Sequence, residues 1–176
     1  MELTTERLNI RTLLPEDWKP LLRIADDFRA SPYLIYDMPL PSEEAAIREL
    51  TTRFAESGLF FAVFLKERPE MIGYICFHRE ADTYDLGYCF HSAYQGNGFA
   101  YEGCAALMGY LRVLHGDIRF TAGTALDNHP SCKLLERLGF ALTDTETLSF
   151  HRDAAGNDIV FTGGRFETRP LSGCKV

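Results

Sequence analysis

The sequence predicts an α+β protein in which helices cover both faces of a central, mostly antiparallel mixed sheet. Three alternating apolar runs follow one another with short polar connections, which is typical of antiparallel hairpins. A glycine-rich loop then opens a long helix, and a strand, a short helix and two closing strands complete the chain. At 176 residues the chain has the length of one domain, so we expect residues 1–176 to form a single domain.

The first part of the chain predicts one strand and two helices. Residues 8–13 alternate between apolar and polar side chains, which favours a strand. Proline and acidic residues then suit the first turn of a helix over residues 15–28. We expect Ser42 to cap a second helix, whose apolar residues recur at helical spacing, and Gly58 to end it.

The connection between these helices, residues 31–41, is unusually apolar. It carries three prolines among Tyr33, Leu34, Ile35, Tyr36 and Met38. Such a segment is not expected to extend freely into water. It either packs over the core or lines a substrate pocket, and the sequence leaves both interpretations open.

The middle of the chain predicts the hairpins. We expect strands at residues 59–65, 71–78 and 84–90, joined by the polar connections 66–70 and 79–83. Each connection is too short for a crossover helix, so neighbouring strands must run antiparallel.

The C-terminal half predicts alternating elements. A helix after the glycine-rich loop ends at Gly116, and residues 118–124 alternate as a strand. A short helix over residues 130–138 ends at Gly139, which suits a helix C-terminus. Two final strands flank the turn at residues 153–158.

Charge and cysteine content exclude several classes of protein. The net charge is -7 and no basic stretch is present, so we expect no nucleic-acid partner, whereas a cationic amine substrate is compatible. No two cysteines form a C-x-x-C pair, which argues against a disulfide framework and against a metal site, and we expect small buried side chains. The five are Cys76, Cys89, Cys104, Cys132 and Cys174.

The N-terminus and the hydropathy pattern indicate a soluble protein. The first residues lack the apolar region of a signal peptide. No stretch approaches the roughly 18 apolar residues of a membrane span. We therefore expect a cytoplasmic protein without a membrane partner, and either a monomer or a homodimer.

The glycine-rich loop at Gly96 and Gly98 is the main functional signal. A helix N-terminus offers unpaired N–H groups to an anion, and glycine lets the backbone approach it. The loop is not a nucleotide P-loop, because Gly-Lys-Ser/Thr is absent from the chain. It is not a dinucleotide fingerprint either, because Tyr101 stands where the third glycine belongs.

The loop matches the pattern Q-x-x-G-x-A at Gln95, Gly98 and Ala100, after a strand that reads Leu86-Gly87-Tyr88. Here the sequence resembles the GNAT-type N-acetyltransferases, in particular the branch of the ribosomal-protein N-terminal acetyltransferases. The matching motifs occur in family order at residues 5–11, 71–75, 86–88, 94–102 and 128–140. The resemblance spans residues 3 to about 165 and implies a GNAT-like fold.

The resemblance implies a coenzyme-A donor site. Backbone groups of Tyr88, Cys89 and Phe90 would pair with the pantetheine arm as an added strand does. Backbone N–H groups of the loop would hold the pyrophosphate; its residues are Gln95, Gly96, Asn97, Gly98, Phe99 and Ala100. Asn128 would contact the pantetheine, cap the following helix, or do both.

The resemblance also suggests catalytic residues. Many relatives carry a tyrosine that acts as general acid at the position of Leu135, so this general acid is missing here. The branch that this chain resembles uses a serine, which is Ser131, although a serine also suits the start of a helix. For the general base, Asp85, His78 and a water relay stay open, since both side chains also suit a solvated strand end.

The sequence also leaves open the role of two basic side chains and the choice between two functions. Lys133 and Arg137 either meet the donor's 3′-phosphate or form an exposed helix face. The leading hypothesis is transfer of an acetyl group from acetyl-CoA to a primary amine of a protein N-terminus, a lysine or a small molecule. The alternative is a sensor that binds acyl-CoA without turnover.

Overall fold

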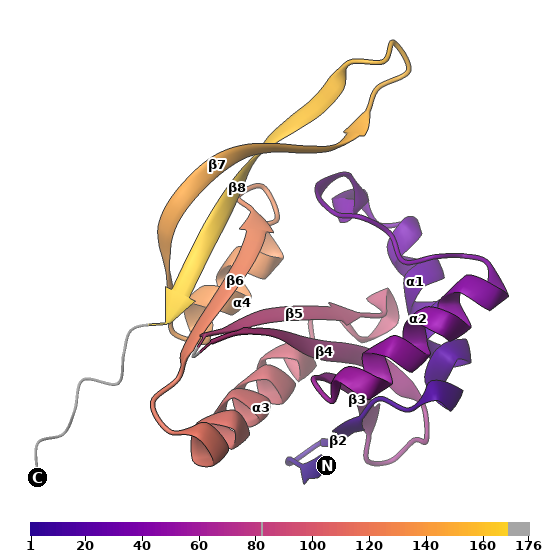
Figure 1. Cartoon of the computed structure of the whole chain (residues 1–176), viewed down its shortest axis with the longest axis vertical. Helices are drawn as coiled ribbons and strands as arrows, with labels where there is room; N and C mark the ends of the chain where they lie inside the picture. Colours follow the sequence, from indigo (N-terminus) through magenta and orange to yellow (C-terminus); the bar gives the residue numbers. More distant parts are fainter. Residues whose placement is uncertain (82, 169–176) are drawn as a thin grey trace, which may run out of the picture.

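The computed structural model describes residues 1–81 and 83–168, which include a mixed eight-stranded sheet (Figure 1). The strands follow the order β1-β2-β3-β4-β5-β6-β8-β7. They are β1 (Glu2–Thr4), β2 (Leu8–Thr12), β3 (Phe60–Leu65), β4 (Met71–Glu80), β5 (Thr83–Phe90), β6 (Arg119–Ala125), β7 (Phe140–Arg152) and β8 (Asp158–Thr168). Within the described residues β5 and β6 pair in parallel and the other neighbours antiparallel, which confirms the predicted sheet.

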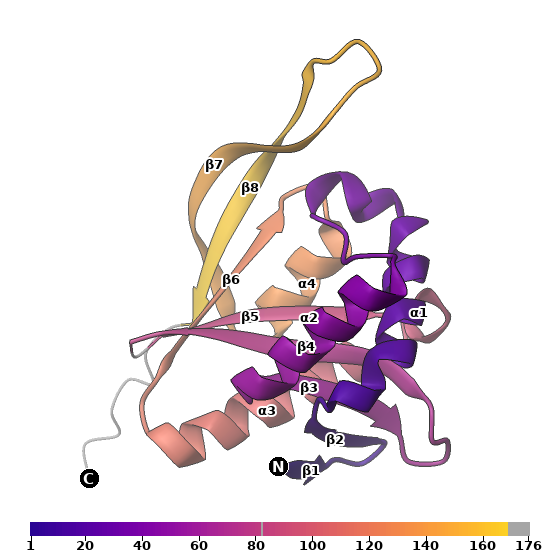
Figure 2. The same cartoon turned by 45° about the vertical axis from the view of Figure 1, so that its right-hand side comes forward.

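Helices cover both faces of this sheet, as predicted (Figures 1 and 2). They are α1 (Trp18–Arg29), α2 (Glu44–Ser57), α3 (Phe99–His115) and α4 (His129–Arg137), with short 3₁₀ helices η1 (Pro15–Asp17), η2 (Pro32–Tyr36) and η3 (Ser92–Tyr94). Leu21 and Ile24 lie three residues apart on one side of α1 and pack against one face of the sheet, with Phe60 of β3. The other face buries Cys104 and Leu107 of α3.

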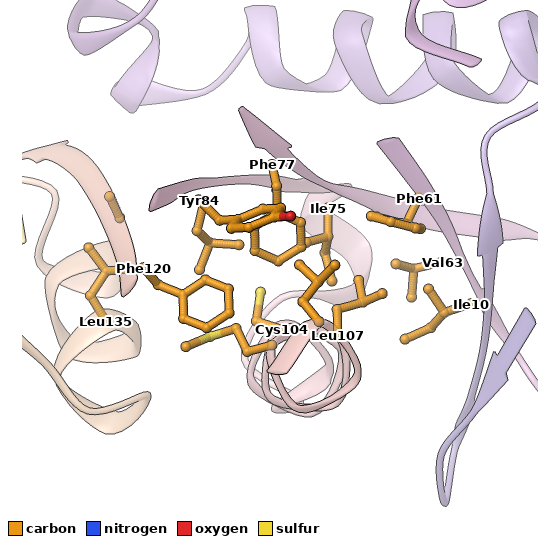
Figure 3. Packing of buried hydrophobic residues seen from close by; sticks show 14 of the residues in the cluster. Ile10, Phe61, Val63, Ile75, Phe77, Tyr84, Cys104, Leu107, Phe120 and Leu135 are labelled. Atoms are coloured by element: carbon orange, nitrogen blue, oxygen red, sulfur yellow. The ribbon is translucent and has the colours of Figure 1, made fainter. Parts of the chain in front are cut away.

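The larger core lies between the sheet and α3 (Figure 3). Phe77, Tyr84 and Phe120 are all but fully buried there, and each ring lies within 6.3 Å of the next. Burying a side chain of this size contributes about 1.5–3 kcal/mol. These three rings come from β4, β5 and β6, so they stabilise the point where β5 and β6 meet.

Some predicted boundaries differ from those observed. Ser42 does not cap α2, since Glu43 holds the N-cap position and the Ser42 hydroxyl donates to the Glu43 carboxylate. Gly58 does end α2, with a left-handed φ of +67°. The predicted connection 79–83 is mostly strand, because β4 continues to Glu80 and β5 begins at Thr83. Strand β1 at the sheet edge was not predicted.

Strands β5 and β6 part after a short contact. Their registered pairs are Thr83 with Arg119, Tyr84 with Phe120 and Asp85 with Thr121. Beyond Asp85, β5 stays paired with β4, whereas β6 follows β8. Figure 1 shows the two strands diverging, with β6 rising beside β8 and β7. The sheet therefore opens in its middle.

The described cysteines have unreactive surroundings. Cys76, Cys89, Cys104 and Cys132 are free thiols, and Cys174 lies outside the described residues. Burial raises the pKa of Cys76 and of Cys89 to about 12, so both stay protonated near neutral pH. In the described part of the chain, no helix is both long and apolar enough to cross a membrane.

Candidate active site

A cleft of about 950 Å³ occupies the opening between β5 and β6. The N-terminus of α3 and helix α4 contribute to its walls, as do η2 and the β7–β8 hairpin. The predicted site residues that line it are Asp85, Tyr88, Cys89, Phe90, Gln95, Gly96, Gly98, Phe99, Ala100, Asn128 and Ser131. Asn97 is not among the lining residues. Most of the residues singled out from the sequence thus meet in one place.

The edge of β5 facing the cleft carries free backbone groups. The His91 N–H donates to the Ile72 carbonyl, 3.0 Å away, and β5 keeps its register with β4. Because backbone direction alternates along a strand, the N–H groups of Tyr88 and Phe90 point away from β4 and into the cleft. The backbone of Cys89 faces β4 instead, so this residue offers only its side chain.

The loop after β5 is fixed by its own side chains. Gln95 Nε2 donates to the Phe90 carbonyl at 2.8 Å. Asn97 Nδ2 donates to the carbonyls of Tyr94 and Gln95, which turns this amide away from the cleft. The Gln95 N–H is already used, since it donates to the Ser92 carbonyl. The predicted anion seat, which is the set of backbone N–H groups that would bind the anion, therefore begins after Gln95.

Helix α3 starts with unpaired donors. Its first backbone bond runs from the Glu102 N–H to the Gly98 carbonyl at 3.1 Å. The N–H groups of Gly98, Phe99, Ala100 and Tyr101 consequently have no intrahelical acceptor. Gly98 has a φ of +78°, which an L side chain adopts only with strain, and this turn aims the donors at the cleft.

Four hydrogen bonds made by Thr5 and Arg7 hold this helix start in place. Glu102 accepts from the Thr5 hydroxyl and from the Arg7 backbone and guanidinium, at 2.5 to 2.8 Å. Arg7 Nη1 also donates to the Asn97 carbonyl at 2.9 Å. Although burial acts in the opposite direction, these hydrogen bonds lower the pKa of Glu102. The connection between β1 and β2 is thereby tied to the start of α3.

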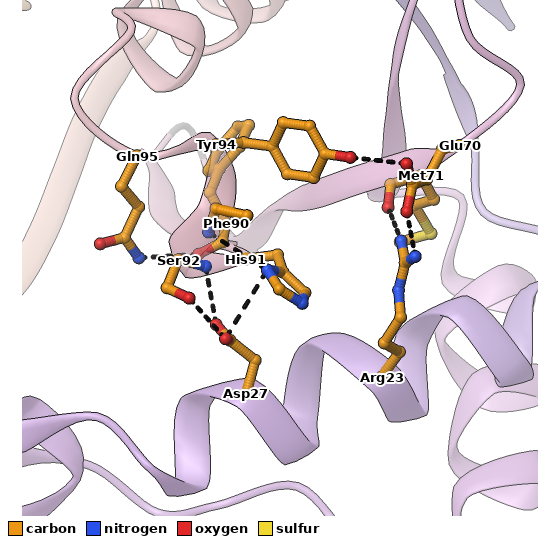
Figure 4. Close-up of polar contacts among 10 residues, drawn as sticks. Arg23, Asp27, Glu70, Met71, Phe90, His91, Ser92, Tyr94 and Gln95 are labelled. Atoms are coloured by element: carbon orange, nitrogen blue, oxygen red, sulfur yellow. Dashed lines mark hydrogen bonds and ion pairs between the residues drawn. The ribbon is translucent and has the colours of Figure 1, made fainter.

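A second polar network supports the loop from the side of α1 (Figure 4). Asp27 accepts from the backbone N–H and the hydroxyl of Ser92, at 2.7 and 2.6 Å. The Tyr94 hydroxyl donates to Glu70 at 2.5 Å, and Glu70 also contacts Arg23. The seat for the anion is therefore built on fixed neighbours rather than on a free loop.

Two hydroxyl groups meet on the α4 side of the cleft. Tyr88 Oη and Ser131 Oγ lie 2.7 Å apart. Burial raises the pKa of Tyr88 well above its ordinary value, so its hydroxyl stays protonated and can donate to Ser131. Asn128 Oδ1 accepts from the Ser131 N–H at 3.3 Å, which is the predicted helix cap.

Carboxylate Asp85 lies on the other face of β5. Its side chain accepts from the Thr121 hydroxyl at 2.8 Å, at the last β5–β6 pair. Tyr88 packs against the core around α3, whereas Cys89 packs against the core around α1 and α2. Strand alternation puts Asp85 with Cys89 and opposite Tyr88. A pair of hydroxyl groups and a carboxylate therefore flank the opening from opposite faces of β5.

The matches to known proteins now decide the family. A family model described as an acetyltransferase (GNAT) domain matches residues 7–141, which is more than half of the chain. The chain belongs to the GNAT acetyltransferase family. The predicted family is thus confirmed, and membership of it makes this chain an acyltransferase.

A known protein is similar to this chain in sequence, and solved structures share its fold. YnaD, an uncharacterized N-acetyltransferase of Bacillus subtilis (strain 168), is 27% identical over 141 residues, 79% of this chain and 82% of that protein. A GNAT-family acetyltransferase from Bacillus anthracis superposes with a TM-score of 0.75 at 22% identity, over 95% of this chain and 97% of that one. RimL, a ribosomal L7/L12 α-N-protein acetyltransferase, superposes with a TM-score of 0.78 at 18% identity. The superposition covers 97% of this chain and 94% of RimL. RimL has also been solved in complex with coenzyme A.

Sequence reasoning missed one functional feature of this GNAT site. Tyr88 was predicted to contribute its backbone, and Leu135 marked a missing tyrosine. The hydroxyl of Tyr88 also contacts Ser131, 43 residues further along the chain. Strand alternation gives the face of β5 on which the Tyr88 side chain lies. No pattern in the sequence shows that α4 packs beside that face with Ser131 next to the Tyr88 hydroxyl.

The basic residues of α4 also border the cleft. Lys133 and Arg137 both line it, and the Arg137 guanidinium lies over the Tyr101 ring at 3.9 Å. Stacking holds this charge close to the start of α3. The Arg137 side chain therefore lies on the side of the cleft where the N-terminus of α3 offers its donors.

Proposed function

We propose that this GNAT protein transfers an acetyl group from acetyl-CoA to a primary amine. The observation that carries the proposal is the continuity of the donor site. The free edge of β5 at Tyr88 and Phe90 leads through a fixed loop to the unpaired N–H groups of α3. An extended amide-containing arm that ends in a pyrophosphate matches both parts.

The residues present fit such a donor. Tyr88 and Phe90 would hydrogen-bond the amides of the pantetheine arm, and the N–H groups from Gly96 to Ala100 would bind the pyrophosphate. Lys133 and Arg137 would meet the 3′-phosphate. The complex of RimL with coenzyme A supports a donor of this class. Asn128 acts here by capping α4, which positions Ser131.

The two faces of β5 suggest how the chain assists the reaction. A thioester supplies the acetyl group and a good leaving group. Asp85 would accept the proton that the attacking amine loses, directly or through water, on the α1–α2 face. A β5 N–H directed into the opening would donate to the oxyanion. As the N–C bond forms and the C–S bond breaks, Ser131 would donate its hydrogen toward the leaving sulfur, with Tyr88 donating to Ser131.

Donor binding is tested first by thermal unfolding. Millimolar coenzyme A should raise the melting temperature, because a ligand that binds only the folded state adds about 2.7 kcal/mol at 100 times its Kd. NADH, which also carries a pyrophosphate, serves as the control and should produce no comparable shift. A melting temperature that coenzyme A leaves unchanged would contradict the proposal.

Turnover is tested separately. Thiol release from acetyl-CoA should appear with at least one amine of a broad panel of peptides, lysine derivatives and small amines. Donor binding without release across that panel would favour the alternative, an acyl-CoA sensor. Placement in the cytoplasm, a single domain and a monomeric or dimeric state stay predictions.

A further inference from the structure

Segment η2 and the C-terminal hairpin meet over the end of the cleft opposite α4. His151 Nε2 of β7 lies 3.0 Å from the Leu34 carbonyl and 2.8 Å from the Asp37 carbonyl. The Tyr36 and Phe161 rings contact edge to face, with centroids 5.2 Å apart. Two segments more than a hundred residues apart thus join to form one wall, which Figures 1 and 2 show as the hairpin arching toward η2.

This wall is aromatic. The rings that line the cleft here are Phe28, Tyr33, Tyr36, Phe150 and Phe161. Phe150 and Phe161 lie 5.5 Å apart, and Phe150 keeps 42% of its surface exposed. Ile35 and Met38, close in sequence to Tyr36, are also exposed, at 39% and 65%. A large apolar surface left open at a cleft mouth indicates an apolar ligand.

Carboxylate Asp37 stands within this aromatic wall. It lines the main cleft and also a small adjoining pocket of about 60 Å³, which Cys89 and Tyr88 share. In the part of the chain that the structure describes, its recorded hydrogen-bond donor is the Met38 N–H at 2.7 Å. A carboxylate has about four acceptor positions, so most of its capacity is open.

The surroundings of Asp37 leave its charge poorly compensated. Partial burial raises the pKa of Asp37, although the Met38 N–H and the nearby His151 act in the opposite direction. Asp37 nevertheless keeps an exposed surface, and it lines the cleft. A cationic ligand that enters the cleft would supply the missing partner, and the α1–α2 face of β5 lies beside it.

We propose that Asp37 binds the ammonium group of the acceptor, while Tyr36, Phe150 and Phe161 contact an apolar or aromatic group attached close to that nitrogen. This inference rests on the proposed acetyl transfer and names the acceptor class for it. The same chemistry occurs in small arylalkylamines and in polypeptides that begin with a large apolar residue. A polyamine or a polar amine fits the aromatic wall less well.

The test compares initial rates of thiol release with five acceptors. These are 2-phenylethylamine, ethanolamine, spermidine and two short peptides, one beginning with Phe and one with Asp. The expected result is a kcat/KM at least roughly tenfold higher for the acceptors that carry a phenyl group, since burying a ring is worth more than 1.4 kcal/mol. Preference for the Phe peptide over 2-phenylethylamine would indicate a polypeptide acceptor, and the reverse a small molecule.

Two variants distinguish the contribution of the Asp37 charge to acceptor binding from that of the aromatic rings. Asp37→Asn should raise KM for the phenyl acceptor by roughly tenfold, because a charge-assisted hydrogen bond is lost, and should leave the coenzyme A melting shift unchanged. Tyr36→Leu should lower the preference for the phenyl acceptors over ethanolamine. Asp144→Asn is the matched control, since Asp144 accepts from the next residue's N–H at 2.8 Å just as Asp37 does, but does not line the cleft.

The outcomes are distinct. An unchanged KM in Asp37→Asn, or equal use of spermidine and the phenyl acceptors, would overturn this inference and leave acetyl transfer standing. A coenzyme A melting shift with no thiol release from any of the five would also overturn it. Absence of both the melting shift and thiol release would remove the proposed function, and this inference with it.

Discussion

At the residue scale, the contact between Tyr88 and Ser131 couples a strand to a helix across the cleft. The 2.7 Å separation means that one hydroxyl donates to the other. Because the pKa of Tyr88 is raised by burial, Tyr88 is better suited to orient and polarise Ser131 than to release its own proton. We therefore assign the proposed acid role to the pair rather than to Ser131 alone.

Substitutions at this pair should be non-additive. We expect Ser131→Ala to lower kcat by about 10²-fold and to leave coenzyme A affinity near normal, because proton donation acts only in the transition state. Tyr88→Phe should lower kcat by a smaller factor, and the double variant should be little worse than Ser131→Ala. Steady-state kinetics with a saturating amine measure these values.

The control for this pair is Tyr110→Phe, which removes a tyrosine hydroxyl on α3 outside the cleft lining. It should retain full kcat. An unchanged kcat in Ser131→Ala would remove the acid role, and additive effects would show that the two hydroxyls act independently.

At the element scale, the start of α3 depends on the left-handed turn at Gly98. A glycine with the same backbone conformation, Gly58, ends α2 far from the cleft, with φ +67° and ψ 3° against φ +78° and ψ 5° at Gly98. Neither position has a neighbour that would collide with an added Cβ, so any cost of alanine comes from the backbone. A comparison of alanine substitutions at the two glycines therefore distinguishes an effect on folding stability from an effect on ligand binding.

We expect Gly98→Ala and Gly58→Ala to reduce the free energy of unfolding by similar amounts, about 1–2 kcal/mol each, because alanine is strained in the left-handed region. Gly98→Ala alone should also weaken coenzyme A binding, by shifting the unpaired N–H groups. Urea unfolding and calorimetric titration measure the two effects. Equal coenzyme A affinity in both variants would argue against an anion seat at α3.

The sequence predicted the helices and strands better than the contacts between distant segments. Alternation and glycine positions placed the strands of the hairpins and the ends of α2 and α4 near their observed positions, because these signals are local. The Ser42 cap was wrong, because the helix starts one residue later than a serine cap requires. The partners of Tyr88 and Asp37 come from distant segments, and only the packing of the sheet brings them together.

At the scale of the whole molecule, Glu102 joins the N-terminus of the chain to the active site. Its partners Thr5 and Arg7 lie more than 90 residues away in the sequence. The Glu102 side chain is 16% exposed and that of Arg7 44%, so solvent weakens this ion pair only in part. The carboxylate form is favoured in the folded state, because the pKa of Glu102 is lowered below its ordinary value of 4.5.

Glu102→Gln should lower the free energy of unfolding near neutral pH by about 1 kcal/mol, after allowance for solvent exposure of Arg7. A lowered folded-state pKa adds stability above the unfolded pKa, and this stability is lost as pH falls through the folded value. The difference between wild type and variant should therefore shrink below about pH 4.5. Urea unfolding at several pH values measures it.

The exposed pair of Glu44 and Arg48 provides the comparison for this prediction. Their side chains are 62% and 52% exposed, and the pair lies one turn apart on α2. Glu44→Gln should change stability by a few tenths of a kcal/mol at most. A difference for Glu102→Gln that stays constant with pH would show that its carboxylate is not the stabilising form.

The parting of β5 and β6 leaves the molecule with a seam. Strands β1–β5 with α1–α3 lie on one side of this seam, and β6–β8 with α4 on the other. The β5–β6 pairs up to Asp85, the Tyr88–Ser131 contact, the shared core around Phe120 and the contacts of His151 with η2 join the two sides. A bound donor would bridge this seam with backbone hydrogen bonds on the β5 side. Amide hydrogen exchange at Tyr88 and Phe90 should therefore slow on binding coenzyme A, and exchange on the C-terminal side of the seam should slow with it, as its opening becomes coupled to ligand release.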